Sequence, residues 1–266
     1  MTISKEMLEK IALLRPIDDV LFAQLVVDIR TCQEMLQKVM KDSNLVVLTV
    51  IPQNVVRNIW GRSVILDALC RLGDGTTCCI EVQRSNNDNH VRRSVFNAAS
   101  VIVKDSETGT DFSDIKDIYV VYISEFDFLK GNKTIYHIDS IIRETGDIIN
   151  TGMHFVFVNT EIDDGSDIAE LMSCFLQRRI HNTKFPELSK RMTYLKETKG
   201  GQTYMCEVLK EMLDESEIKS AIKAARLLNA SDDQIIDMLE TGYHLTRKDA
   251  TYQLDLYKSD NSVSIN

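Results

Sequence analysis

Residues 63–83 read SVILDALCRLGDGTTCCIEVQ. Two apolar, partly β-branched runs, Ser63–Leu72 and Thr76–Gln83, flank the turn cluster Gly73-Asp74-Gly75. This pattern predicts two strands joined by a tight turn. In both runs, the residues that would point to either face of a strand are mostly apolar. This favours a strand pair in the middle of a sheet, buried on both faces.

The pairing of the two strands decides where the acids lie. A three-residue loop makes Leu72 face Thr76, and counting back then places Asp67 opposite Glu81, with Gln83 on the same face as Glu81. A two-residue loop would put the two acids on opposite faces. Acids that face each other repel, so we expect a divalent cation between them or a shifted pKa. The alternative is an exposed hairpin whose acids are solvated.

The spacing of these acids resembles a known signature. Asp67, a turn, and then Glu81-Val82-Gln83 are similar to the motif of the PD-(D/E)XK nuclease superfamily, and the glutamine resembles its transposase-like branch, the recombination-promoting nucleases. The supporting pieces are Pro16–Phe22, Gly61-Arg62-Ser63 before the first strand, and Arg92-Arg93 on the next helix. The resemblance covers roughly residues 15–160.

The resemblance implies an α/β fold with a restriction-endonuclease-like core, a central mixed sheet flanked by helices in the order αβββαβ. It implies a metal-dependent endonuclease that hydrolyses phosphodiester bonds of DNA, with a link to recombination or mobile DNA. Asp67, Glu81 and Gln83 would be catalytic, and Asp67, Glu81 and Asp19 would hold Mg²⁺, or Mn²⁺ in its place. Most of the superfamily has lysine where this chain has Gln83, which carries no charge and cannot act as a base.

Two further candidates carry open alternatives. Asp19 stands at the start of an expected helix, where an acid lies near the active site in the resembled family, but acids there also serve as caps. Arg92 and Arg93 begin the helix predicted for His90–Asp105. Either could hold a DNA phosphate through bidentate hydrogen bonds, or could be solvated or ion-paired.

Length and composition predict one main domain with an appendage. The chain has 266 residues, 44% of them hydrophobic and 27% charged, as in ordinary globular proteins. We expect a nuclease-like domain over residues 1–162 and a helical region over residues 163–266 that packs on it or forms a homodimer. The net charge of -9 opposes nucleic acid as a partner, although binding depends on local basic surface.

Location is predicted from what the sequence lacks. No run of apolar residues is long enough for a membrane span, and the first residues lack the features of a signal peptide. The six cysteines show neither CxxC nor zinc-site spacing, so we expect core thiols and a reducing cytoplasm. His137 and His154 lie on strand-like runs and are expected to be structural.

Several elements outside the hairpin are predicted from periodicity. Strands are expected at Leu45–Ile51, Asp117–Ile123, Lys133–Ile142 and Met153–Asn159, and helices at Ile168–His181 and Thr203–Leu228, with a break at Gly200-Gly201. Ser231 and Thr246 should cap two later helices. The basic residues between Arg178 and Lys199 are equally compatible with a phosphate-facing patch and with a solvated face.

A second function class stays open beside the nuclease. The same fold could serve as a catalytically inactive module for protein or DNA binding, which the net charge and Gln83 favour and the paired acids oppose. A nucleotide-binding protein is disfavoured because no GxxxxGK[ST] or GxGxxG motif is present.

Overall fold

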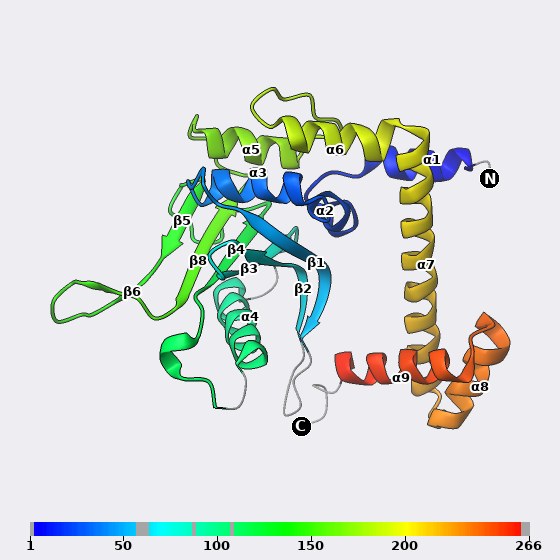
Figure 1. Cartoon of the computed structure of the whole chain (residues 1–266). Coiled ribbons are helices and arrows are strands. Elements are labelled where there is room, and N and C mark those ends of the chain that lie inside the picture. The colour runs from blue at the N-terminus through cyan, green and yellow to red at the C-terminus, as the bar shows by residue number, and fades with distance from the viewer. Residues whose placement is uncertain (1–2, 57–63, 87–88, 107–108, 262–266) are drawn as a thin grey trace. The chain divides into compact units, whose positions relative to one another are not determined.

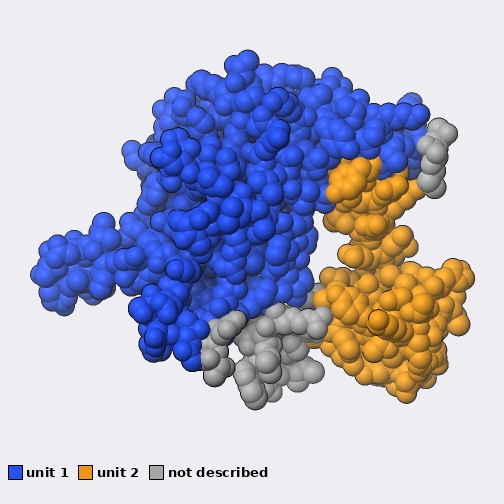
Figure 2. Space-filling model, viewed as in Figure 1, with its two compact units in different colours: residues 1–56, 64–203 blue, residues 57–63, 204–266 orange. Residues whose placement is uncertain are grey.

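The computed structural model describes residues 3–56, 64–86, 89–106 and 109–261 of the chain. The predicted pieces Gly61-Arg62-Ser63 lie outside these ranges. The described chain forms two compact units, one ending at Thr203 and one beginning at Tyr204 (Figure 2). The sequence prediction placed the boundary at residue 162, whereas the first unit also contains the next two helices.

The first unit is built around a mixed six-stranded sheet with the order β1-β2-β3-β4-β8-β5 (Figure 1). Its strands are β1 (Val47–Val56), β2 (Val64–Leu72), β3 (Thr77–Gln83), β4 (Ile118–Ser124), β8 (Met153–Asn159) and β5 (Ile135–Ile138). The first three are antiparallel neighbours, while β3, β4 and β8 run parallel. Two short strands, β6 (Ser140–Ile141) and β7 (Ile148–Ile149), form a separate hairpin.

Helices cover both faces of this sheet (Figure 1). Helix α4 (His90–Asp105) joins β3 to the parallel strand β4 and packs Ala98 and Val101 against Cys79 and Val120. Helices α2 (Asp19–Val26) and α3 (Ile29–Val39) cover the other face, where the Sγ atoms of Cys32 and Cys70 lie 3.5 Å apart. The expected αβββαβ core is confirmed, because α1 (Lys5–Leu13), α2 and α3 precede β1.

Distant parts of the sequence hold the α2–α3 layer in place. Helices α5 (Asp167–Phe175) and α6 (Pro186–Glu197) pack against it. The Glu34 carboxylate accepts hydrogen bonds from the first N–H groups of α6, and Arg191 donates to the Gln24 carbonyl. The buried Lys196 ammonium donates to the carbonyls of Ala12, Leu14 and Arg178, at 2.9, 2.6 and 2.6 Å. Burial lowers the pKa of Lys196 to about 8.

Four of the basic residues in this region take part in packing or ion pairing. Besides Arg191 and Lys196, Lys184 pairs with Asp167 and Glu170, and Lys190 pairs with Glu187. The helix predicted for residues 168–181 is too long, since α5 ends at Phe175.

The break predicted at Gly200-Gly201 lies two residues earlier, at Thr198, where the backbone is extended between α6 and helix α7 (Lys199–Leu227). Both glycines lie inside α7, which continues for 29 residues. A Cβ atom on Gly201 would clash with the Tyr194 carbonyl at the end of α6. Glycine is needed here for the close approach of two backbones, a role that a sequence pattern does not distinguish from a helix stop.

The second unit contains most of α7, together with α8 (Asp232–Tyr243) and α9 (Arg247–Asn261). Its apolar core includes Ile222, Ile235, Leu239 and Leu254. The predicted cap at Ser231 is confirmed as a capping box with Gln234. In the described part of the chain, no helix is both long and apolar enough to cross a membrane.

Candidate active site

The β2–β3 hairpin has the pairing predicted from a three-residue loop. The Leu72 N–H donates to the Thr76 carbonyl at 2.9 Å, and the ladder runs from Arg71–Thr77 to Ala68–Ile80. The turn needs a glycine at Gly75, whose φ of 89° lies in the left-handed region. Asp67 and Glu81 are the next residues beyond the last ladder pair, one on each strand.

Beyond this last ladder pair, a side chain of one strand bonds to the backbone of the other. Asp67 Oδ2 accepts a hydrogen bond from the Val82 N–H at 2.8 Å. The Asp67 backbone N–H in turn lies close enough to the Glu81 carboxylate to oppose part of its pKa rise. These two contacts turn both side chains into the same region of the sheet.

Burial disfavours the ionised form of both acids. Glu81 has no exposed surface, and Asp67 is largely buried. Loss of hydration raises the pKa of Glu81 well above its usual range, and the neighbouring Asp67 charge raises it further. Burial likewise raises the pKa of Asp67 to about 6, with a contribution from the charge of Asp19. Two carboxyl groups that share a site and resist ionisation form a place where a cation is favoured.

Helix α4 brings the partners of Glu81. Arg93 Nη2 lies 3.4 Å from Glu81 Oε2, and Arg93 Nη1 donates to Gln83 Oε1 at 3.0 Å. One helical turn later, the buried Asn97 donates from Nδ2 to Glu81 Oε1 at 3.2 Å. The Gln83 amide nitrogen donates to the carbonyl and the hydroxyl of Ser85. The sequence interpretation missed Asn97, although its spacing of four residues from Arg93 places both on one helix face.

Of the other predicted site residues, Arg93 and Asp19 lie near the acids and Arg92 does not. Arg93 faces the acids, whereas Arg92 is exposed on another side of α4. Asp19 is the first residue of α2. Its charge raises the pKa of Asp67. The Arg93 charge opposes the rise that burial causes in the pKa of Asp19 itself. Asp19 therefore lies at the edge of the same site, on the opposite layer from Arg93.

A second group of charges at this edge was not predicted. Arg84, which directly follows Gln83, places Nη1 2.7 Å from Asp18 Oδ1. Arg15 Nη2 lies 2.7 Å from Glu125 Oε1, beyond the end of β4. These ion pairs fix the start of α2 against the ends of β3 and β4, and so set the position of Asp19.

The donor set fits a hard divalent cation. Such ions prefer carboxylate oxygens, and Mg²⁺ is commonly held by one or two carboxylates together with water and phosphate oxygens. Asn97 Oδ1, buried beside Glu81, has no hydrogen-bond partner within the described residues, which fits a site completed by a hydrated ion. No group of three or more His, Cys, Asp or Glu side chains in those residues is arranged to hold a metal. Asp67 and Glu81 are thus the two buried or nearly buried carboxylates at this edge that could hold such an ion, with Asp19 further out.

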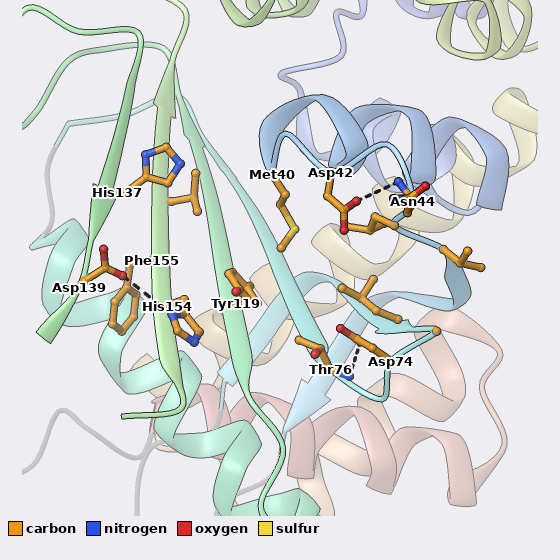
Figure 3. Close-up of a pocket in the computed structure, with 15 residues that line it drawn as sticks. Met40, Asp42, Asn44, Asp74, Thr76, Tyr119, His137, Asp139, His154 and Phe155 are labelled. Carbon is orange, nitrogen blue, oxygen red and sulfur yellow. Dashed lines mark hydrogen bonds and ion pairs between the residues drawn. The ribbon is translucent and has the colours of Figure 1, made fainter. Parts of the chain in front are cut away.

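A large cavity lies elsewhere on the sheet (Figure 3). Its volume is about 660 Å³, and Tyr119, His154, Asp74 and Asp139 are among the residues that line it. Tyr119 pairs with Cys78, three residues before Glu81, so it faces the opposite side of the sheet. His154 stacks on Tyr119 and contacts Asp117 at 3.1 Å. Cavity size therefore does not locate the acids of the hairpin.

The fold and the hairpin acids together define a restriction-endonuclease-like α/β protein with the acidic motif of PD-(D/E)XK nucleases. A model of the PD-(D/E)XK nuclease family transposases matches residues 29–248. The chain belongs to this family, whose wider superfamily generally uses divalent metal ions. The match includes Asp67, Glu81, Gln83 and α4, and begins after Asp19. No curated protein and no solved structure matches the chain.

Proposed function

We propose that this protein is a Mg²⁺-dependent endonuclease that hydrolyses phosphodiester bonds of DNA. The observation that carries the proposal is the buried pair of carboxyls, Asp67 and Glu81, at the end of the central hairpin. Keeping two acids side by side away from water costs stability, and the cost is offset when they bind a cation. Membership of a nuclease family supports the same chemistry, and a role in recombination or mobile DNA rests on that membership alone.

The residues of the site divide the work. Asp67 and Glu81 hold the cation, which when bound lowers the pKa of a water molecule and stabilises charge on the phosphate. The hydrogen bond from the Val82 N–H fixes the Asp67 carboxylate, and the one from Asn97 fixes Glu81. Arg93 provides a guanidinium for the scissile phosphate, because its planar donors match phosphate oxygens.

Gln83 takes the position that lysine occupies in most of the superfamily. Its amide can orient water but cannot remove a proton. In the structure this amide is held between Arg93 and Ser85. We therefore assign Gln83 to positioning: it holds the Arg93 guanidinium in the metal-free protein, and its amide offers a hydrogen bond to the attacking water when DNA is bound.

A metal titration tests the proposal directly. Calorimetry with Mg²⁺ or Mn²⁺ should show saturable binding to the wild type, and Asp67→Asn should remove it. Asp139→Asn, the same change at an exposed position by the distant cavity, is the matched control and should bind as the wild type does. Plasmid nicking should follow metal binding across the three proteins. Nicking that survives Asp67→Asn would come from a contaminant and would remove the proposal.

The second candidate is a catalytically inactive module that uses the same fold for binding. The engagement of both ends of the Gln83 amide by Arg93 and Ser85 favours it, since an occupied amide has less freedom to orient water. This candidate predicts that the wild type neither binds Mg²⁺ nor nicks DNA, so the titration above also separates the two.

A further inference from the structure

Arg93 lies beside Glu81, the carboxylate that a metal ion bound at this site would also contact. Its guanidinium reaches from Glu81 Oε2, at 3.4 Å, to Gln83 Oε1, at 3.0 Å. The Arg93 charge lowers the pKa of both Asp67 and Glu81 and so opposes the effect of burial on each acid. One guanidinium therefore acts as counter-ion to the whole acid pair.

A guanidinium and a divalent ion cannot both be held tightly by the same carboxylate pair. Like charges a few ångströms apart repel strongly where water is largely excluded. About a third of the Arg93 side chain, 34%, is exposed, so it has room to turn outward, whereas Asn97 is fully buried. The two neighbours of Glu81 thus differ: Arg93 can move away from the carboxylate, and the buried Asn97 cannot.

We propose that Arg93 is a resident cation, which holds the acid pair in the metal-free protein and is exchanged for the metal ion when DNA is bound. The released guanidinium then contacts the DNA phosphate, while Asn97 stays on Glu81 Oε1 and keeps the carboxylate in place as a positioning residue. This inference rests on the proposed nuclease function. It makes metal binding and phosphate binding support each other, since each draws one member of the Arg93–Glu81 pair away from the other.

The helix provides a matched control. Arg92 precedes Arg93 and carries the same charge, but its side chain is exposed, and successive residues of a helix are turned about 100° from each other around the axis. A change at Arg92 alters the net charge of the protein by the same amount without touching Glu81. Effects common to both arginines are therefore long-range electrostatics, and effects confined to Arg93 come from the contact.

Mn²⁺ affinity, measured by calorimetry without DNA, tests the exchange. Arg93→Gln should bind Mn²⁺ about 10-fold more tightly than the wild type because the competing cation is gone. Arg92→Gln and the charge-preserving Arg93→Lys should stay within about 3-fold of wild type. Asn97→Ala should bind about 10-fold more weakly, as when a partner of a metal ligand is removed. Opposite signs at two positions on one helix face cannot arise from a general loss of α4 stability.

DNA affinity tests the other half of the exchange. Anisotropy of a labelled duplex should show that Arg93→Gln weakens binding in Ca²⁺, which takes the same oxygen ligands, and has little effect in EDTA. Unchanged or weaker Mn²⁺ binding by Arg93→Gln, with the wild type binding normally, would overturn the exchange and leave the nuclease proposal standing. Absence of Mn²⁺ binding by the wild type would overturn both.

Discussion

Acids lie near both ends of the parallel strands, but the acids at the two ends differ in their exposure to solvent. Near the end of β3, Glu81 is fully buried, and burial raises its pKa. Near the start of β4, Asp117 is 37% exposed, and the hydrogen bond from His154 lowers its pKa. The cavity of about 660 Å³ also lies toward this second end, where Tyr119 and His154 line it. Burial of the carboxyl, rather than the number of acids or the size of a hollow, separates the proposed catalytic end from the other.

The largest effect is expected from Glu81→Gln. The change keeps the shape of the side chain and its bond from Asn97, but removes the charge that holds the cation. Cleavage of plasmid DNA in Mg²⁺ should fall by about 10³-fold or more, as when a principal electrostatic group is lost. The melting temperature should stay or rise, since a buried anion is removed. Cleavage at the wild-type rate would place catalysis away from the buried end.

Gln83 should show a smaller effect. Replacing it with alanine removes both the hydrogen bond to Arg93 and the one available to water, so single-turnover cleavage should drop by about 10²-fold. Gln83→Lys restores the commoner superfamily residue and should retain activity. Equal rates for Gln83→Ala and wild type would exclude Gln83 from the site and leave Asp67 and Glu81 as its catalytic residues.

The buried end should also give the protein a distinctive pH dependence. Asp67 has a pKa of about 6 when folded, against an ordinary value of 3.8. The folded state therefore binds protons first as the pH falls, and the free energy of unfolding of the metal-free protein should increase by about 1 kcal/mol between pH 7 and pH 5. Glu81, whose pKa is also raised, acts in the same direction.

Urea unfolding at the two pH values, with EDTA present, measures this difference. Asp67→Asn should remove the Asp67 part of the increase, while Asp117→Asn should leave it unchanged, because a lowered pKa matters only in more acid solution. A wild-type protein that loses stability between pH 7 and pH 5 would contradict the burial of the acid pair.

The smallest effect is expected at the exposed end. His154→Gln removes the contact with Asp117 and the ring stacked on Tyr119, and should lower the free energy of unfolding by about 1 kcal/mol or less. Metal binding and cleavage should be unchanged. A loss of cleavage comparable to that of Glu81→Gln would show that the exposed end also takes part in catalysis, and would contradict the comparison.

The sequence predicted the features that depend on local spacing. Counting through a three-residue turn set Asp67 beside Glu81, because side chains alternate along a strand, while the two-residue loop that would have separated the acids stayed open until the structure was known. It could not choose between Arg92 and Arg93, since a rotation of one residue around α4 decides which arginine faces the sheet. Asn97 was missed for the same reason: its role depends on tertiary packing, and an asparagine inside a helix carries no signal of its own.

Features that depend on contacts between distant helices were harder still. The break between α6 and α7 was placed on Gly200-Gly201 instead of Thr198, because the constraint that requires a glycine at 201, the Tyr194 carbonyl, comes from a different helix. Cys32 and Cys70 were expected in the core, and they are buried, but nothing in their spacing of 38 residues indicated that their sulfur atoms lie together.

The ammonium of Lys196 has a consequence for how the chain is made. It binds the carbonyls of Ala12 and Leu14, residues that leave the ribosome more than 180 positions earlier. The hairpin with Asp67 and Glu81, and then α4, are synthesised in between. We therefore expect the nascent sheet to pair its strands before the first helices have their final anchor. The acids of the site would be placed on one layer early in translation, and the layer that carries Asp19 would close over them last.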